Sequence, residues 1–298
     1  AGPIYPAGKQ ASALSDCLLR KAEKLGVAIK LSTKVTAIQR GFKLTLSDGS
    51  CLAADRVVLA AGGKAQKQFG ADGGGFALAQ SLGHRITPLE PSLVQLKCNT
   101  QHIKTLKGIR TECNVTAYGA DGKVLGTSSG DVIFTDYGVS GNAIFYISAY
   151  CAGVNGAKLS LEFLPEVSKE EIVRDVERKA KLGYPQSELL SGTLHNQLGR
   201  AVIKRCQSCK PEDIAGTVKN FTLEVEGSLG FDYAQVTRGG VHAKDVGADL
   251  QSKLVPNLYF AGEVLDVDGD CGGYNLTWAF ASGMHVAKCI AYGYDNDD

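Results

Sequence analysis

The sequence of 298 residues has little methionine, little tryptophan and no excess of charge of either sign. Thirty-two basic residues stand against thirty-one acidic ones, which leaves a net charge of +1. A chain that binds nucleic acid or an anionic membrane through its charge would carry a clear basic excess. No apolar run approaches the length of a membrane-spanning helix either. We therefore expect neither nucleic acid nor a membrane as a partner.

The nine cysteines lack the dense spacing of a disulfide scaffold, which a chain of this length does not need. This usage favours a reducing, cytoplasmic location. Cys206 and Cys209 form a C-x-x-C pair that would suit a redox pair or half of a zinc site. A zinc site requires four ligands, and no second cysteine pair or His-x₃₋₅-His is present. We therefore interpret both cysteines as structural and expect no metal.

The start of the sequence also lacks an expected feature. It begins AGPIYP, and its single methionine is Met284, so we do not expect residue 1 to be a translation start. We expect the parent protein to be longer than this chain. For the same reason, the absence of a signal peptide is weak support for a cytoplasmic location, because a lost leader would leave no trace.

Glycine, by contrast, is abundant, with 36 residues that gather in short groups beside apolar runs. VVLAAGGKA at residues 57–65 runs from apolar residues into a glycine pair, and LYFAGEVLD at residues 258–266 follows a similar pattern. The first run lacks polar alternation, which predicts a strand of a parallel sheet covered on both faces, and we read the second in the same way. A buried strand that ends in bare glycine backbone lets a ligand approach closely.

The pattern of helical and β segments changes twice along the sequence. This predicts an α/β fold, α+β overall, with an inserted domain. Residues 1–95 and 237–298 combine helices, short strands and glycine groups, whereas residues 96–236 hold β-rich segments and then charged helical ones. In the first part we expect a helix over residues 11–25 and a hairpin that turns at SDGS. In the middle part we interpret NAIFYISAY, at residues 142–150, as β.

The second glycine segment contains the most candidate site residues. Gly262 and Glu263 come directly after the predicted strand, and residues 272–275 begin an apolar helix. The free N–H groups of a helix N-terminus suit an anionic or electron-rich ligand edge. Glu263 is placed to accept hydrogen bonds from hydroxyl groups, such as those of a ribityl chain.

Three aspartates alternate between these two features, namely Asp266, Asp268 and Asp270. Alternating carboxylates can bind calcium, but an EF-hand loop continues to a glutamate that is absent here. We therefore interpret the three aspartates as a solvated acidic loop.

Several segments together resemble the HI0933-like flavoproteins, a family of FAD-dependent oxidoreductases that includes BaiN-type reductases and aminoacetone oxidase-like proteins. These segments are VVLAAGGKA, GADGGGFALAQSLGH, FTDYGVSGNA, VTRGGV and SKLVPNLYFAGEVLDVDGDCGGYNLTWAFASG. The resemblance spans essentially the whole chain. It implies a glutathione-reductase-like FAD-binding domain, at residues 1–95 and 237–298, interrupted by an inserted β-barrel and helical domain at residues 96–236.

Carried over by position, the resemblance implies eight residues that bind FAD. Val35 would face the adenine end through its backbone, Gly62 and Gly63 would approach the cofactor, Gly262 and Glu263 would meet the pyrophosphate and ribityl region, and Gly273, Asn275 and Leu276 would lie near the flavin pyrimidine ring. It also implies a small-molecule substrate, with NAD(P)H or molecular oxygen as the other redox partner. It identifies no catalytic residue, no specific substrate and no oligomeric state; His242 would lie near the flavin, but we assign it no proton transfer.

The sequence departs from the family at its start. Family members begin with a strand and a helix joined by a G-x-G-x-x-G loop, and nothing before Ala1 supplies this loop. GADGGG at residues 70–75 lacks the required spacing. Two alternatives to a truncated flavoenzyme therefore stay open: a non-catalytic fragment that folds but binds no flavin, and a zinc-dependent binding module built on Cys206 and Cys209.

Overall fold

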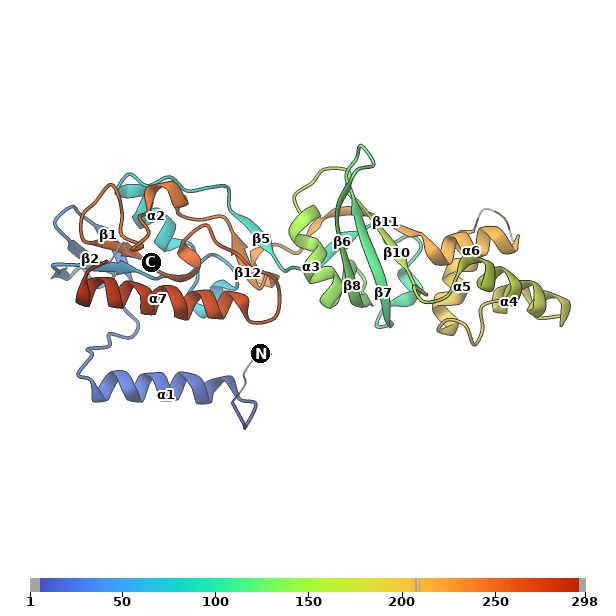
Figure 1. The fold of residues 1–298 in the computed structure, drawn as a ribbon, viewed down its shortest axis with the longest axis horizontal. Coiled ribbons are helices and arrows are strands. Elements are labelled where there is room, and N and C mark those ends of the chain that lie inside the picture. The colour runs from blue at the N-terminus through green and yellow to red at the C-terminus, as the bar shows by residue number, and fades with distance from the viewer. Residues whose placement is uncertain (1–5, 207, 209, 295–298) are drawn as a thin grey trace.

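The structure is a computed structural model that describes residues 6–206, 208 and 210–294. Figure 1 shows three parts in a row: an α/β lobe, a β-barrel and a cluster of helices at the far end. Helix α1 (Ala11–Lys24) lies apart from the lobe and buries none of its residues. The expected helix over residues 11–25 is thus confirmed.

The described chain contains seven α-helices and thirteen strands. After α1, the helices are α2 (Gly74–Ser81), α3 (Asn142–Cys151), α4 (Lys169–Lys181), α5 (Asn196–Arg205), α6 (Pro211–Lys219) and α7 (Tyr274–Tyr292). The strands are β1 (Val35–Ile38), β2 (Lys43–Leu46), β3 (Cys51–Ala53), β4 (Val57–Leu59), β5 (Glu90–Ser92), β6 (Leu96–Cys98), β7 (Arg110–Tyr118), β8 (Val124–Phe134), β9 (Gly138–Ser140), β10 (Lys158–Glu162), β11 (Phe221–Ser228), β12 (Val236–Arg238) and β13 (Leu258–Phe260). No described helix has both the length and the apolar character that a membrane span needs.

Two parallel strands from opposite ends of the sequence lie at the centre of the α/β lobe. β13 pairs with β4, with Leu258 opposite Val57 and Phe260 opposite Leu59, so the predicted parallel pairing is confirmed. The prediction of cover on both faces is wrong for β4, because Val58 is 43% exposed, whereas all of β13 is buried. Among the described strands β4 pairs with β13 alone, so its other edge is open.

An antiparallel sheet of β1, β2 and β3 completes the lobe. β2 and β3 form the hairpin that the SDGS turn predicts, with Leu44 opposite Leu52, and Gly49 takes a positive φ of 82° in this turn. The buried side chains of Ile38 and Phe42 join the core that includes residues of β4, α2 and β13. This core packs the sheet of β1, β2 and β3 against the parallel pair of β4 and β13.

A closed six-stranded barrel follows, with the strand order β10-β11-β6-β9-β8-β7. Along β7 the buried residues Cys113, Val115 and Ala117 alternate with partly exposed ones, as expected where one face of a strand points into a barrel. The β-rich middle part of the sequence is therefore a barrel, and the overall mixture of α and β structure agrees with the prediction.

Residues 142–150, which we expected to be β, form helix α3 instead. The buried residues Ile144, Ile147, Ser148 and Cys151 recur at helical spacing. An apolar run of this length fits either a strand or a buried helix by composition alone. Its packing against β7 and β8 decides the outcome, because α3 contacts both strands and covers one side of the barrel.

The helical cluster at the far end is held together by α4, α5 and α6. Ser168 caps α4 with a capping box, in which its hydroxyl accepts the N–H of Glu171 and the Glu171 carboxylate accepts the N–H of Ser168. The buried ammonium of Lys179 donates to Asp175 at 2.6 Å and to Thr193 at 2.5 Å. This contact fastens α4 to the segment that precedes α5.

Within the lobe, a mostly buried carboxylate ties two loops together. The side chain of Asp245 is 7% exposed. It accepts the backbone N–H of Arg85 at 2.9 Å and the Nε–H of the same residue at 3.1 Å. The hydrogen bonds from the Arg85 guanidinium lower the pKa of Asp245 from its ordinary value of 3.8 to about 2. This carboxylate therefore stabilises the folded chain in its charged form.

Replacing Asp245 by asparagine should lower the free energy of unfolding at pH 7 by about 1–3 kcal/mol, because it weakens charged hydrogen bonds at a mostly buried site. A group whose pKa is lower in the folded chain stabilises that chain above its unfolded pKa and loses this effect as the pH falls through the folded value. The difference between wild type and D245N should therefore shrink as the pH falls from about 4 to about 2. Denaturant unfolding measured across this range checks the prediction.

Asp136 offers a matched control, because its ion pair with Lys107 is open to solvent, with side chains 64% and 67% exposed. D136N should leave the free energy of unfolding close to the wild-type value, because exposed ion pairs contribute little to stability. An equal loss in D136N and D245N would contradict the role given to the Asp245 contact.

Candidate functional site

The ends of β4 and β13 form the candidate site, because parallel strands bring their carboxyl ends to the same edge. Gly62 and Gly262 both have left-handed backbone, with φ of 70° and 73°. This conformation favours glycine over any residue with a Cβ. The two glycine groups recognised in the sequence thus follow two strands that are paired side by side.

Gly63 provides the closest contact between the two strand ends. A Cβ placed on Gly63 would lie 2.5 Å from Oγ1 of Thr237 and closer still to Oε1 of Glu263. The carboxylate of Glu263 therefore rests directly on the bare backbone of Gly63. A side chain at position 63 would have to displace this carboxylate or Thr237.

The Glu263 carboxylate is partly buried and is hydrogen-bonded by Thr237. Oε1 accepts the backbone N–H of Thr237 at 2.7 Å. Burial raises the pKa of Glu263 above its ordinary value of 4.5, and the hydrogen bonds from the Thr237 backbone and hydroxyl act in the opposite direction. The negative charge of Asp268 also raises this pKa. The site thus contains a carboxylate whose charged form is disfavoured by its surroundings.

Gly262 is buried against the middle of α7, and its backbone groups are already used. Its N–H donates to Oγ of Ser282 at 2.8 Å, and its carbonyl oxygen accepts the indole N–H of Trp278 at 3.2 Å. Gly262 therefore joins β13 to α7. Its N–H and carbonyl groups are therefore already hydrogen-bonded within the chain. A cofactor contact from Gly262 stays a prediction.

The N-terminus of α7 is open. Gly273 takes a φ of 93°, no side chain caps the helix, and no acidic residue stands in the first turn. A Cβ on Gly273 would meet no atom within 4 Å. The Asn275 side chain is engaged, since it accepts the N–H of Gly269 at 2.8 Å and donates to the carbonyl oxygen of Gly269 at 2.9 Å. Leu276 is 65% exposed.

Val35 begins β1, next to the loop at residues 70–75. Lys34 forms an ion pair with Asp72, and Oδ1 of Asp72 accepts the N–H of Gly74 at 2.9 Å. The carboxylate of Asp72 therefore occupies the N-terminus of α2, where a phosphate would otherwise bind. This agrees with the sequence interpretation that GADGGG is not a phosphate loop. The role of Val35 stays a prediction.

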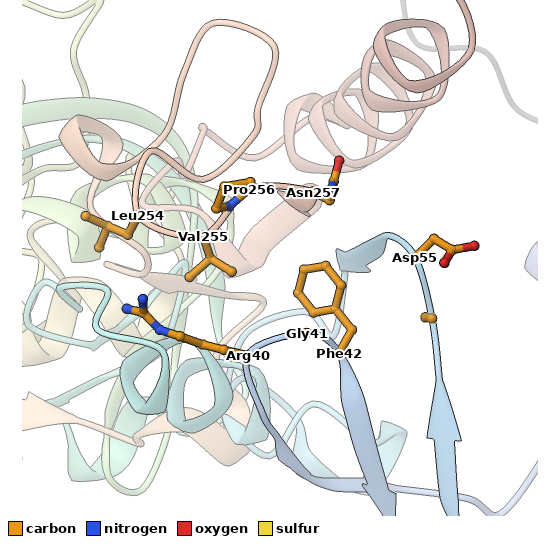
Figure 2. Close-up of a pocket in the computed structure, with 9 residues that line it drawn as sticks. Arg40, Gly41, Phe42, Asp55, Leu254, Val255, Pro256 and Asn257 are labelled. Atoms are coloured by element: carbon orange, nitrogen blue, oxygen red, sulfur yellow. The ribbon is translucent and has the colours of Figure 1, made fainter.

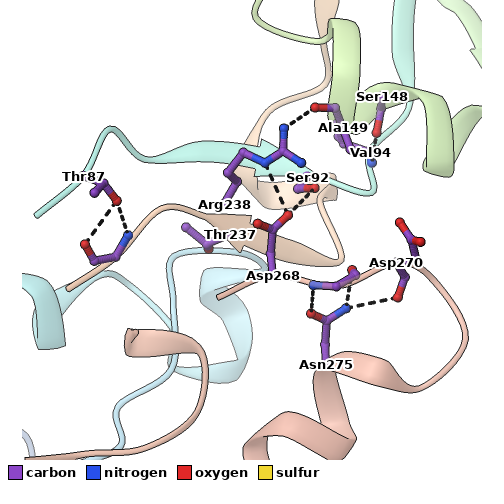
Figure 3. A network of polar contacts seen from close by, with 12 residues as sticks. Thr87, Ser92, Val94, Ser148, Ala149, Thr237, Arg238, Asp268, Asp270 and Asn275 are labelled. Carbon is purple, nitrogen blue, oxygen red and sulfur yellow. Dashed lines mark hydrogen bonds and ion pairs between the residues drawn. The ribbon is translucent and has the colours of Figure 1, made fainter. Parts of the chain in front are cut away.

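The acidic loop is not simply solvated, which corrects the sequence interpretation. The Asp268 side chain is 17% exposed, and its Oδ2 accepts Nε–H of Arg238 and the hydroxyl of Ser92, each at 3.3 Å. Figure 3 shows Arg238 extending from this contact to the carbonyl oxygen of Ala149 on α3. The hydroxyl of Tyr146, also on α3, donates to the carbonyl oxygen of residue 271 at 2.5 Å. The loop therefore connects the lobe to the barrel.

A pocket of about 370 Å³ lies at the other end of the parallel pair (Figure 2). Its lining includes Arg40, Phe42, Asp55 and Asn257. Asp55 and Asn257 precede β4 and β13, so this pocket is at the amino ends of the strands, away from the glycines. Ligands of parallel sheets bind at the carboxyl ends, and we do not assign this pocket to the candidate site.

Two histidines of the lobe, His84 and His242, make contacts that are typical of packing residues. His84 is buried, with its ring nitrogens 3.0 Å from the carbonyl oxygen of Ala79 and 2.7 Å from Oγ of Ser252. Nδ1 of His242 accepts the N–H of Lys244 at 3.1 Å. Neither contact connects a histidine to Glu263.

Cys209 lies outside the described residues, so the structural interpretation of the C-x-x-C pair stays a prediction. Within residues 6–206, 208 and 210–294, no three histidine, cysteine, aspartate or glutamate side chains are grouped to hold a metal ion. The zinc-dependent alternative gains no support from this part of the chain.

Thr237 is the site residue that sequence reasoning missed. It lies within VTRGGV, a segment that carries the family resemblance, but nothing in its spacing marked the threonine itself. Its contacts with residues 64, 65 and 263 join segments far apart in the sequence. Only the fold brings them together.

Comparisons with known proteins identify relatives of this chain. The 3-dehydro-bile acid delta(4,6)-reductase of Clostridium scindens is 36% identical, with 97% of this chain and 76% of the reductase covered. The ribosomal RNA dihydrouridine synthase of Escherichia coli is 28% identical, with 93% and 72% covered. A crystal structure of 3-ketosteroid delta1-dehydrogenase from Sterolibacterium denitrificans, 15% identical, gives a TM-score of 0.41, and this chain covers 62% of it, a likeness too weak to inform the fold.

The sequence model of the HI0933-like protein Rossmann domain matches residues 1–289. This match extends over nearly the whole chain, including β4, β13 and the glycine groups that follow them. The protein therefore belongs to the HI0933-like family.

Proposed function

We propose that the protein is an FAD-dependent oxidoreductase. The observation that carries the proposal is the meeting of two glycine-ended parallel strands around the Glu263 carboxylate, which rests on the backbone of Gly63. Bare backbone at the carboxyl ends of a parallel sheet is where such folds bind nucleotide cofactors. Membership of the HI0933-like family and the similarity to a reductase support the same conclusion.

The residues at this edge fit a cofactor with a polyol chain and an electron-rich ring. Glu263 would accept a hydrogen bond from a ribityl hydroxyl, Gly62 would let the cofactor lie against the backbone, and Gly63 would act by making room for the Glu263 carboxylate. The open N-terminus of α7, at Gly273, would place N–H groups at the flavin pyrimidine ring and favour negative charge there by about 0.3–2 kcal/mol. When bound, the flavin supplies two-electron chemistry. Val35 would contact the adenine end.

We also propose the finer architecture that the family resemblance implies. Residues 1–95 and 237–298 would form a glutathione-reductase-like FAD-binding domain, and residues 96–236 would form its insert. The pairing of β4 with β13 across the barrel supports this division. We further propose that the protein is cytoplasmic, and that it takes electrons from NAD(P)H or passes them to molecular oxygen.

For the substrate, we propose a small molecule with a carbon–carbon double bond conjugated to a carbonyl group. Two similar proteins carry names that share this chemistry, since one reduces a 3-dehydro bile acid and the other makes dihydrouridine. A double bond next to a carbonyl accepts hydride more readily than an isolated one. The net charge of +1 disfavours RNA as the substrate of this chain.

We expect the purified chain to bind FAD, giving flavin absorbance near 450 nm. Reduced under anaerobic conditions, the bound flavin should be reoxidised by a conjugated enone and not by the saturated ketone of the same skeleton. Stopped-flow absorbance of the flavin measures both reactions.

Absence of FAD binding to the folded chain would contradict the proposed function and favour the non-catalytic alternative. If the protein reduces uridine in ribosomal RNA and turns over no enone, the proposal of a small-molecule substrate is contradicted. The proposal that the protein binds FAD would not be affected by this result.

Replacing Gly63 by alanine should weaken FAD binding at least about tenfold, because the new Cβ displaces the Glu263 carboxylate. The same crowding should lower the free energy of unfolding by about 1–3 kcal/mol. Fluorescence titration with FAD and denaturant unfolding measure the two effects.

Gly283 provides the matched control. It lies in α7, and a Cβ placed on it would meet no atom within 4 Å. G283A should bind FAD like the wild type and be at least as stable. Wild-type FAD affinity in G63A would show that the carboxylate is not held against position 63 as described.

A further inference from the structure

Thr237 links the two strand ends of the candidate cofactor site. Its side chain is 1% exposed, and it lies on β12, the strand that returns from the barrel. Its backbone N–H donates to Oε1 of Glu263 at 2.7 Å. Its hydroxyl oxygen accepts the N–H groups of Lys64 at 2.7 Å and Ala65 at 3.1 Å. One residue therefore contacts the loops that follow both β4 and β13.

The hydroxyl proton of Thr237 is directed by these contacts. A threonine hydroxyl has one proton and two lone pairs, and the two backbone N–H groups occupy both lone pairs. The O–H group is left to donate, and the Glu263 carboxylate is the acceptor beside it, since Oε1 of Glu263 and the Thr237 hydroxyl oxygen lie against the same point next to Gly63. A buried, β-branched residue with little rotational freedom in its side chain therefore presents both its backbone N–H and its hydroxyl to Glu263.

The second carboxylate oxygen of Glu263 has a different environment. Among the described residues, none donates a hydrogen bond to Oε2, and Oε2 is not fully buried. Oε2 therefore keeps some exposure to solvent and is available to accept a hydrogen bond. A ligand hydroxyl beside the strand ends would find an acceptor whose direction is already fixed.

We propose that Thr237 is a positioning residue of the cofactor site: it engages one side of the Glu263 carboxylate and turns the other oxygen toward a hydroxyl of the cofactor's polyol chain. The identity of the ligand rests on the proposed FAD-binding function. The orientation of the carboxylate is a property of the chain by itself. Preorganised acceptors of this kind contribute to binding because no ordering is needed when the ligand arrives.

The charged groups around Glu263 make the contribution of Thr237 measurable. Burial raises the pKa of Glu263, and the negative charge of Asp268 raises it further. Lys64 gives only its backbone N–H to this network, because its ammonium lies over the ring of Phe231, 4.7 Å from the ring centre. The two donors of Thr237 are therefore the contacts that favour the charged carboxylate.

The test is a ¹³C NMR titration of the Glu263 carboxyl group in the full chain, with the resonance assigned by its loss in E263Q. T237V removes the hydroxyl and keeps the shape and the backbone N–H, whereas T237S keeps the hydroxyl. We expect the pKa of Glu263 to rise in T237V and to stay at the wild-type value in T237S. A purely structural role for Thr237 would leave the titration of Glu263 unchanged in T237V, and this result would overturn the proposal.

A matched control is T222V, which removes a hydroxyl that hydrogen-bonds Arg205 in the barrel, with no contact to Glu263. It should leave the Glu263 titration at the wild-type value, and a rise equal to that in T237V would overturn the proposal. Should T237V fail to fold, T237C, which keeps the size and donates only weakly, has the same expected result.

Titration with FAD separates this proposal from the proposed function. FAD should shift the Glu263 resonance in wild type and T237S, and should bind T237V about tenfold more weakly. Equal FAD affinity in T237V and wild type would overturn the ligand-facing role of Thr237. If folded wild type takes up no FAD, the proposed function fails, while the Glu263 titration still decides whether Thr237 positions the carboxylate.

Discussion

The parallel pairing of β4 with β13 is the constraint on which the rest of the lobe depends. It joins segments from opposite ends of the sequence, and the entropic cost of closing so long a loop grows only slowly with its length. A whole barrel and a helical cluster can therefore lie between the two strands. The register that sets Phe260 beside Leu59 also brings the following residues together, so that Glu263 meets Gly63.

Glu263 differs from Asp245 and Asp175, two carboxylates that stabilise the fold of this chain. Both oxygens of Asp245 and both oxygens of Asp175 accept hydrogen bonds, and the pKa of each is lowered to about 2. Glu263 is held on one oxygen, and burial raises its pKa instead. Asp268, which connects the lobe to the barrel, also accepts its hydrogen bonds on one oxygen, but it does so from an arginine. Glu263 combines a free oxygen with a raised pKa and no paired cation among the described residues, which suits the ligand-binding role proposed for it.

The sequence allowed the parallel pair, the hairpin and the family to be predicted, because local apolar runs, Asp-Gly turns and long motifs encode them. It did not allow α3 to be recognised, since an apolar run at residues 142–150 fits either structure until it packs against a barrel. The contacts of Asp268 with Arg238 and of Thr237 with Glu263 were also missed. Each joins segments that only the tertiary structure places side by side, so no local pattern records them.

β12 connects the candidate site to the barrel, because neighbouring residues of a strand point to opposite sides. The backbone N–H of Thr237 donates to Glu263. Figure 3 shows that Arg238 reaches Asp268 and the carbonyl oxygen of Ala149 on α3. Asp268 belongs to both networks, since its charge raises the pKa of Glu263 while it pairs with Arg238. Arg238 pairs with Asp268 and reaches the carbonyl oxygen of Ala149 on α3 with the same guanidinium group. The loop that follows Glu263 is therefore held to the barrel through this side chain.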